Sequence, residues 1–383
     1  MSAPIRVLVT PKDENPYQRF LYEHVTAAGA EVRYLEGPSG SQTFNLLVAP
    51  LMLARYRLLG YRILHIHWVF QFLLPWASRA AMARRLMQWW FWLYLWSARA
   101  LGYRIVWTAH DLLPHDQVFF DDRRARQYLI SRADAVIALS RASASKLAEL
   151  GATEVPVIPF GPYAEPYPTR LGRKAARDEL GLVAEDVAVL LIGKIESYKG
   201  ADLLLEAAAG LPPSSPVKVI VAGACSDAAY RATLAELARR AGSRAIVRLD
   251  RIPDEEMAGY LEAADFAAFP FRAVTNSSSI LLALSFGLPV LIPNLMSLSD
   301  VPDEAALRYD AFEGGLLEAL ERAARLTGRV RRDMSRAAKQ HAQATDWPTV
   351  ARLHLETYAK LLSRRSIGWT RTGSTTEQPG ALS

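Results

Sequence analysis

Short apolar runs alternate with amphipathic stretches through the first 160 residues of the chain. Runs rich in β-branched residues, which we expect to form strands, lie at 4–10, 31–35, 63–68, 103–109, 135–139 and 155–158. Stretches with a helical period lie between them, at 15–28, 80–101, 123–131 and 142–150. Most of these stretches end at a glycine, which is common just beyond a helix C-terminus. Strands that alternate with helices in this way predict a parallel α/β sheet.

A proline-rich segment separates this half of the chain from the next. Residues 159–170, PFGPYAEPYPTR, contain four prolines and one glycine, a composition typical of an extended linker. The alternation then resumes, with strands expected at 187–192, 217–222, 245–249 and 266–270 and helices at 173–180, 200–209, 228–241 and 254–264. We therefore predict two α/β domains, at 1–160 and 161–345, then a helix at 346–362 and a polar, disordered tail at 363–383.

Composition narrows the functional classes only in part. The chain is 51% hydrophobic and 22% charged, which excludes intrinsic disorder and fibrous structure for most of it. Cys225 is the single cysteine, which excludes a disulfide framework and a cysteine zinc site and favours a reducing compartment. The net charge of +6 suits anionic lipid, phosphorylated ligands and nucleic acid equally. Residues 1–18 contain no apolar core of a secretory signal, so we expect a cytoplasmic protein.

Two α/β domains of similar size joined by a proline-rich hinge are typical of two classes of protein. One is a periplasmic-type binding protein, and the other is an enzyme whose site lies between the domains. The missing export signal argues against the first class. In both classes the ligand is expected at the carboxyl ends of the strands.

The segment GKIESYKG at 193–200 lies directly between a predicted strand and a predicted helix. Gly193 at the strand end allows a ligand to approach the backbone, and Lys194 and Lys199 lie at the start of the helix. A glycine turn, two cations and a helix N-terminus suit a diphosphate. The alternative is an ordinary strand-to-helix loop with solvated lysines.

A run of small polar residues begins the next candidate segment. Asn276, Ser277, Ser278 and Ser279 precede an apolar helix, ILLALSF, and Arg272 lies just before them. Helix capping explains one serine, whereas the whole run also suits anion binding. Arg251 lies at the end of an earlier predicted strand and is a further candidate for the same ligand.

The order of these segments resembles the nucleotide-sugar domain of GT-B glycosyltransferases. The resemblance is carried by G-[KR]-x4-K-G at 193–200, Ala264-Asp265, Pro270 and A-x-x-x-G-x-P-V at 283–290. It implies two Rossmann-like parallel-sheet domains that face across a cleft. The first would bind the acceptor and the second the nucleotide sugar, and the helix at 346–362 would cross back to the first domain. The motifs HIHW, TAHDLLPHD and TNSSSILLALSFGLPV are similar to bacterial glycolipid mannosyltransferases of the exopolysaccharide type, in the group 1 class.

The chain departs from the large retaining GT-B families at one motif. Those families carry a Glu-x7-Glu pair, and alignment on Ala283 places Val274 and Leu282 at the two positions. Neither carboxylate is present, so the stereochemical outcome, retaining or inverting, stays open.

The loop His110–Asp116 in the first half carries four titratable side chains in seven residues. The resemblance implies that His110 contacts the donor sugar. An inverting reaction would need a base for the acceptor proton, and Asp111, His110 and Asp116 are the candidates; a retaining reaction needs none. The alternative is a structural Asx turn with solvated side chains.

His65 and His67 lie on one face of the strand at 63–68, because side chains alternate along a strand. Three interpretations stay open for this pair. The histidines could be metal ligands, although no third ligand is near in sequence; they could line the acceptor site; or they could be satisfied structural side chains.

The aromatic helix expected at 80–101 is the segment that bears on whether the protein spans or contacts a membrane. Its uncharged part, 86–98, is shorter than the roughly 20 residues of a spanning helix. Its tryptophans, with Trp76 upstream and arginines on both sides, are typical of an interfacial helix; those in the helix are Trp89, Trp90, Trp92 and Trp96. Packing in the core or in a dimer is the alternative.

Taken together, these features predict a hexosyltransferase. The donor is expected to be a GDP- or UDP-sugar, with GDP-mannose favoured, and the acceptor a glycan or a lipid-linked molecule at the inner membrane face. We expect Lys194, Lys199 and the amides of Ser277–Ser279 to stabilise the departing diphosphate without a metal or other cofactor. His110, Asp111 and Lys199 are the catalytic candidates. The competing class is an inactive nucleotide-sugar-binding protein; nucleic acid is not expected, because the basic residues are scattered.

Overall fold

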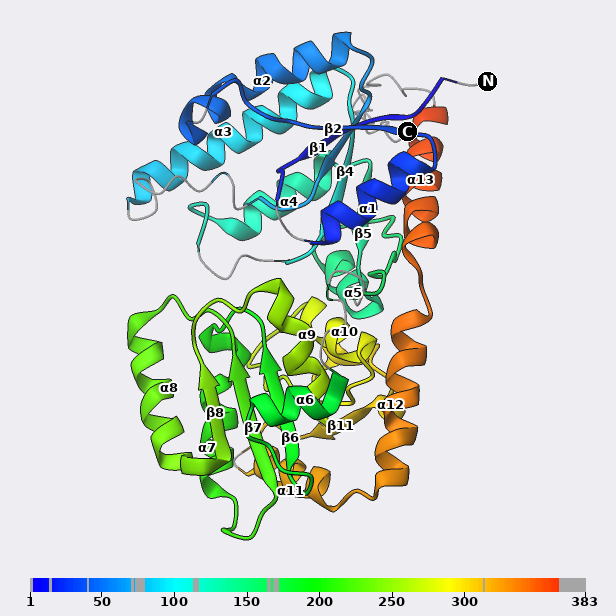
Figure 1. The fold of residues 1–383 in the computed structure, drawn as a ribbon. Coiled ribbons are helices and arrows are strands. Elements are labelled where there is room, and N and C mark those ends of the chain that lie inside the picture. The colour runs from blue at the N-terminus through cyan, green and yellow to red at the C-terminus, as the bar shows by residue number, and fades with distance from the viewer. Residues whose placement is uncertain are drawn as a thin grey trace, which may run out of the picture.

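The computed structural model describes residues 3–13, 16–39, 41–69, 72, 80–112, 117–163, 167, 172–312 and 314–364. The tail predicted over 363–383 lies outside these residues from position 365 on, and most of the predicted linker after 163 does too. Two α/β domains stack on one another, with the N-terminal elements at the top of Figure 1 and the elements from α6 to α12 at the bottom.

The first domain contains a five-stranded parallel sheet in the order β2-β1-β3-β4-β5. Its strands are β1 Arg6–Thr10, β2 Glu31–Tyr34, β3 Ile63–Ile66, β4 Arg104–Ala109 and β5 Ala135–Ala138. These five strands are confirmed where the sequence predicts them. The sixth predicted strand, at 155–158, is wrong as an element, because it contributes only one parallel bridge, between Val157 and Ala138.

Helices cover both faces of this sheet. They are α1 Pro16–Ala27, α2 Gln42–Leu58, α3 Ala81–Ala100, α4 Asp122–Arg132 and α5 Arg141–Glu149. Strand side chains alternate between two clusters: Leu8 packs with α2, α3 and α4, whereas Val7 and Val9 pack with α1. Helix α2 is not among the helices predicted from the sequence. Its apolar residues are divided between the core and the surface and Pro50 lies inside it, so it lacks a single apolar stripe.

The second domain contains a six-stranded parallel sheet in the order β11-β10-β9-β6-β7-β8. Its strands are β6 Val187–Ile192, β7 Val217–Ala222, β8 Ala245–Arg248, β9 Phe266–Ala268, β10 Val290–Pro293 and β11 Ala306–Tyr309. Its helices are α6 Gly172–Glu179, α7 Ala201–Gly210, α8 Ala228–Ala241, α9 Asp254–Ala263, α10 Ser278–Ser285, α11 Gly315–Arg325 and α12 Gly328–Gln343. The two parallel-sheet domains confirm the fold class that the sequence predicts.

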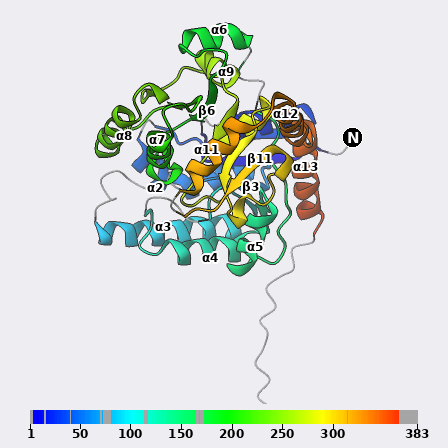
Figure 2. The same ribbon diagram turned by 90° about the horizontal axis from the view of Figure 1, so that it is seen from below.

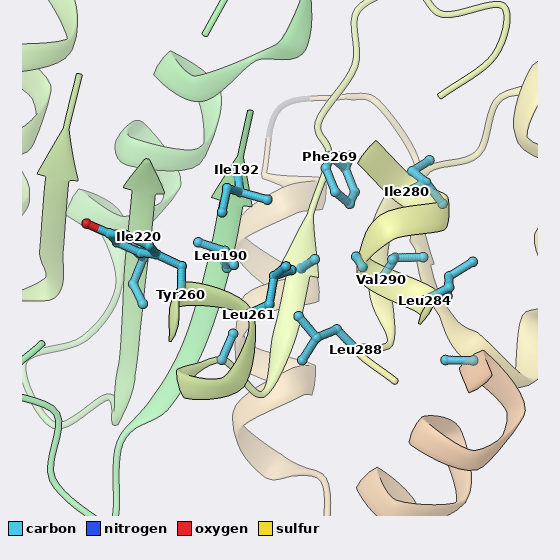
Figure 3. Packing of buried hydrophobic residues seen from close by; sticks show 14 of the residues in the cluster. Leu190, Ile192, Ile220, Tyr260, Leu261, Phe269, Ile280, Leu284, Leu288 and Val290 are labelled. Atoms are coloured by element: carbon cyan, nitrogen blue, oxygen red, sulfur yellow. The ribbon is translucent and has the colours of Figure 1, made fainter. Parts of the chain in front are cut away.

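A continuous apolar cluster anchors α9 and α10 on this second sheet (Figure 3). Leu190 and Ile192 of β6 lie opposite Leu261 of α9, and Ile280 and Leu284 of α10 close the cluster on its other side. Burial of one such side chain stabilises the fold by about 1.5–3 kcal/mol. Because these contacts fix α10 on the sheet, its N-terminus is held at the carboxyl edge of the sheet.

The final helix, α13 Trp347–Ser363, returns to the first domain and packs beside α1 (Figure 1). In the view from below, α12 and α13 follow one another along the same edge of the molecule (Figure 2). Trp347 stacks on Phe20 with ring centroids 5.4 Å apart, and its Nε1 donates to the Pro162 carbonyl over 2.8 Å. A Cβ at Gly161 would lie 2.5 Å from the Trp347 ring, so this close approach requires glycine.

Candidate active site

A small polar pocket of about 80 Å³ lies where the carboxyl edges of the two sheets meet. Asp111, which follows β4, is its described residue from the first domain. The second domain supplies the rest of the described lining: Tyr198, Lys199, Phe271, Val274, Thr275, Asn276, Ser277, Ser278 and Ser279. The pocket therefore brings together two predicted segments of the second domain with one from the first.

Gly193 ends β6 with φ +107°, a left-handed conformation that glycine adopts without strain. A Cβ at this position would lie 3.5 Å from Ser279 Oγ and 3.9 Å from Lys199 Nζ. The backbone of Gly193, the Lys199 ammonium and the start of α10 therefore converge on one point. Gly200 also has a positive φ, and a Cβ there would lie 2.1 Å from the Pro270 carbonyl oxygen, so it allows the two loops to touch.

Two groups place positive charge at one end of the pocket. Lys199 is half-buried there; its desolvation lowers the pKa of the ammonium, and the nearby Glu196 carboxylate partly offsets this effect. The first turn of α10 adds the positive end of a helix dipole. Ser277 caps that helix by accepting a hydrogen bond from Ile280 N at 3.2 Å, while the amides of Ser278 and Ser279 begin the first turn. An anion bound here would contact both amides and Lys199.

Asn276 joins the two domains at the pocket. Its Nδ2 donates to the His110 carbonyl over 3.0 Å, and its Oδ1 accepts from Ser140 Oγ, also over 3.0 Å. Both ends of the side-chain amide are thus bonded to the first domain. Asn276 is one of the predicted donor-binding residues, whereas Ser140 is not, because a contact between residues 136 positions apart leaves no local signal in the sequence.

Two family models match the chain, one on each domain. The model described as a glycosyl transferase 4-like domain matches residues 4–161, and the model described as glycosyl transferases group 1 matches residues 186–332. The chain is a glycosyltransferase of the GT-B fold.

Solved structures agree with this assignment at the level of the fold. Sucrose-phosphate synthase from Thermosynechococcus elongatus aligns with a TM-score of 0.73 at 19% identity, over 94% of this glycosyltransferase and 99% of that chain. HepE of Anabaena, solved in complex with UDP, aligns with a TM-score of 0.71 at 18% identity, over 93% and 100% of the two chains.

Curated relatives differ in how much of them the glycosyltransferase covers. GDP-mannose:glycolipid 4-beta-D-mannosyltransferase of Xanthomonas campestris pv. campestris is 26% identical over 313 residues, which are 79% of this chain and 81% of the relative. D-inositol 3-phosphate glycosyltransferase of Nocardia farcinica is 31% identical over 252 residues, 61% of this chain and 54% of the relative. The glycosyltransferase thus spans about half the length of the second relative.

Besides Gly193, which borders the pocket, three predicted donor-binding residues lie outside its described lining. Lys194 is exposed and paired with Glu196. Arg272 pairs with Asp202 over 2.6 Å, and the hydrogen bonds that the guanidinium donates to Asp202 raise its pKa. Arg251 is exposed just beyond β8, the edge strand of the sheet. Their roles in donor binding stay predictions.

His110 is nearly buried beside the pocket. Its ring stacks on Trp68 with centroids 4.3 Å apart, and its Nε2 lies 3.0 Å from His67 Nδ1. Burial lowers the pKa of His110 to about 3, so the imidazole is neutral at neutral pH and a poor proton acceptor. Asp116 lies outside the described residues. Among the three base candidates, Asp111 is therefore the one that the described pocket supports.

His65 and His67 are structural side chains within the first domain. Both are fully buried, which contradicts the interpretation that they line an acceptor site. Their ring nitrogens contact the hydroxyls of Tyr22, Thr108 and Tyr358 at 2.6–2.9 Å. Within the described ranges, no group of three or more His, Cys, Asp or Glu side chains could hold a metal ion.

Two apolar stripes lie on the surface of α2 and α3, which pack against one another (Figure 1). The α3 stripe repeats every three or four residues and is 44–67% exposed; it consists of Met82, Leu86, Trp89, Leu93 and Trp96. The α2 stripe is 48–89% exposed and consists of Phe44, Leu47, Leu51 and Leu58. We call these nine residues the apolar face.

The four predicted tryptophans of α3 are divided between this face and the core. Trp89 and Trp96 belong to the apolar face, at 67% and 56% exposed. Trp90 and Trp92 are half-buried against the core, and Trp90 Nε1 donates to the Leu46 carbonyl over 3.0 Å. Trp76 lies outside the described residues. No described helix is long and apolar enough to cross a bilayer.

We predict that Lys199→Ala lowers kcat for release of the nucleoside diphosphate by about 10²–10³-fold, or roughly 2–4 kcal/mol of transition-state stabilisation. The reason is that Lys199 Nζ faces the point where Gly193 and α10 converge. Steady-state kinetics of the purified variant measure the loss. Lys174→Ala, an exposed lysine of α6 in the same domain, is the matched control. A Lys199→Ala enzyme within threefold of wild type would contradict the assignment.

Proposed function

We propose that this glycosyltransferase moves a mannosyl group from GDP-mannose to a lipid-linked acceptor at a membrane surface. The observation that carries the proposal is the combination of the apolar face with the Xanthomonas relative, which is named for GDP-mannose and a glycolipid and aligns over 79% of this chain. A purely water-soluble acceptor, such as the D-inositol 3-phosphate in the name of the other relative, would give no reason for nine exposed apolar side chains on two helices.

The donor diphosphate is assigned to the electropositive corner of the interdomain pocket. Negative charge grows on the leaving group as the glycosidic bond breaks, and fixed positive groups stabilise that charge more in the transition state than in the ground state. Lys199 and the amides of Ser278 and Ser279, which lie at this corner, would do this without a metal. Neutral His110 would contribute a hydrogen bond to the donor sugar rather than accept a proton.

We further propose that the reaction inverts the anomeric centre. Val274 lies in the pocket wall and Leu282 in the helix that follows, where the large retaining families carry glutamates. Transfer of an α-linked mannosyl group to a β-linked product, the linkage in the name of the Xanthomonas relative, is an inversion. Asp111 is the only carboxylate in the described pocket lining and would accept the proton of the acceptor hydroxyl.

The acceptor is assigned to a cavity of about 390 Å³ in the first domain, beneath α2. Thr10 and Leu35 place it at the carboxyl ends of β1 and β2, and Leu46, Phe72 and Tyr94 give it an apolar wall. Lys12 and Glu36, paired over 2.6 Å, give it a charged rim. Strand β3 alone separates β1 from β4, so the cavity lies on the order of 10 Å from the end of β4. An acceptor with an apolar part in the cavity could thus extend its hydroxyl toward Asp111.

The apolar face would hold the enzyme at the lipid surface. Its aromatic and aliphatic side chains suit the boundary between headgroups and acyl chains, and exposed Arg85 and Arg99 flank the α3 stripe. Because α2 contributes residues to both the face and the cavity, a lipid-linked acceptor could reach the cavity without leaving the membrane surface entirely.

The purified enzyme is expected to release GDP from GDP-mannose, and to do so undiminished in a chelator, because the pocket itself supplies the positive charge. A panel of GDP- and UDP-sugars, with a polyprenyl diphosphate glycan or D-inositol 3-phosphate as acceptor, measures the preference. Turnover restored only by manganese or magnesium would overturn metal independence. Binding of every nucleotide sugar without turnover would favour the alternative function, an inactive nucleotide-sugar-binding protein.

Replacement of Asp111 by asparagine should lower kcat by about 10²–10⁴-fold, because the amide keeps the shape of the side chain but accepts no proton. NMR of the wild-type product should show a β-linked mannose. Asp250→Asn, at an exposed position of the second domain, is the matched control. An α-linked product together with an active Asp111→Asn enzyme would mean that the reaction retains configuration.

The wild-type protein should co-sediment with vesicles rich in anionic lipid and dissociate from them as salt is raised. The double variant Trp89→Ser/Trp96→Ser should bind at least tenfold less, since both rings are exposed and their loss leaves the core intact. Met296→Ser/Phe312→Ser, which removes two exposed apolar side chains from the second domain, controls for surface hydrophobicity in general. Equal sedimentation of the two double variants would exclude the α3 stripe as the docking surface.

A further inference from the structure

A continuous chain of hydrogen-bonded side chains connects α13 to His110 through the interior of the first domain. Tyr358 Oη of α13 lies 2.7 Å from His65 Nδ1, and Tyr22 Oη of α1 lies 2.9 Å from the same nitrogen. Tyr22 Oη also lies 2.6 Å from His67 Nε2, and His67 Nδ1 lies 3.0 Å from His110 Nε2. Side chains from β3, α1 and α13, and from the residues that follow β3 and β4, thus form one series of hydrogen bonds.

The chain is electrically neutral and closed at its inner end. Burial lowers the pKa of the imidazoles of His65 and His67 well below the usual value, and it raises the pKa of the phenols of Tyr22 and Tyr358 well above theirs. Each imidazole therefore carries one proton, and each hydroxyl carries one. His65 and Tyr358 are fully buried, so water does not reach the end of the series at α13. The contacts between the side chains therefore determine which nitrogen of each imidazole carries the proton.

The protons of these side chains are assigned from their contacts. Tyr22 donates its one proton along the shorter of its two histidine contacts, to His67 Nε2, and Tyr358 donates to His65 Nδ1. His65 then carries its proton on Nε2 and donates it to Thr108 Oγ1 over 2.8 Å.

His67, which accepts at Nε2, must carry its proton on Nδ1 and donate it to His110 Nε2. His110 in turn must carry its own proton on Nδ1, the ring nitrogen that has no hydrogen-bond partner among the described residues.

Tyr358 decides between this arrangement and its reverse. Without the Tyr358 hydroxyl, His65 Nδ1 would be a buried acceptor without a donor, which is unfavourable. The Tyr22 hydroxyl, 2.9 Å away, is the described donor that could turn to it. His67 would then donate from Nε2 to Tyr22, accept at Nδ1 from His110 Nε2, and leave His110 Nδ1 without a proton.

We propose that Tyr358, Tyr22 and His67 are positioning residues that hold His110 as the Nδ1–H tautomer, so that it presents a hydrogen-bond donor to the sugar or diphosphate of the bound donor substrate. Through Tyr358, the helix that returns from the second domain fixes the protonation pattern at the active site in the first. The effect on catalysis rests on the proposed role of His110, whereas the tautomer itself does not.

Nitrogen NMR of the full-length protein with ¹⁵N-labelled histidine tests the tautomer directly, with His110→Gln used to assign the His110 signals. We expect wild-type His110 to show a protonated Nδ1 and an unprotonated Nε2. In Tyr358→Phe we expect either the opposite tautomer or an average of the signals of the two tautomers. Tyr103→Phe is the matched control, because its buried hydroxyl in the same domain donates to the Leu53 carbonyl, outside the chain. A wild-type His110 protonated at Nε2 overturns the proposal, and this result does not depend on the folding of the Tyr358 variant. Unchanged His110 signals in a folded Tyr358→Phe protein also overturn it.

Kinetics then test the coupling to the reaction. Tyr358→Phe should lower kcat by about tenfold, the factor that corresponds to one hydrogen bond, and Tyr103→Phe should not. An altered tautomer with unchanged kcat would remove His110 from the reaction. Absence of turnover in the wild-type enzyme would count against the proposed function but would leave the NMR result, and with it the assignment of protons, intact.

Discussion

The return of the chain to the first domain through α13 is the constraint on which the arrangement of this glycosyltransferase depends. Trp347 fills the space against Gly161 and Phe20, and the helix continues along α1 to Tyr358. The two domains are thus connected both by the segment after β5 and by α13, one side of which is buried against the first domain. This double connection holds the carboxyl edges of the two sheets opposite one another, which is where α/β sheets bind their ligands.

The chemistry of the site follows from that opposition. The second domain alone offers a cation and a helix N-terminus, which suit a diphosphate but include no described carboxylate in the pocket. The first domain brings Asp111 and the neutral ring of His110 to the same place, with Asn276 bonded across the junction. In the proposed reaction, leaving-group stabilisation and proton acceptance would therefore lie in different domains, and a relative movement of the domains would change the distance between the two groups.

The fold could be predicted from the sequence because its parallel strands are buried on both faces and read as short apolar runs. The loop with Gly193, Lys194 and Lys199 and the serine run at 277–279 could be predicted because each is a short local pattern beside a predicted strand or helix. Which tryptophans of α3 face the core and which face solvent could not be predicted, since neighbours such as Trp89 and Trp90 differ only in the side of the helix that they occupy. The histidine chain and the Asn276 bridge depend on residues far apart in sequence, so no local pattern could reveal them.

A crystal structure with GDP-mannose tests the central claim most directly, because it locates the donor and both of its reacting groups in one measurement. The account predicts the diphosphate against Gly193, Lys199 and the first turn of α10, with the mannose directed toward Asp111. A diphosphate bound instead at the exposed Arg251, or a nucleotide held by the first domain, would contradict it.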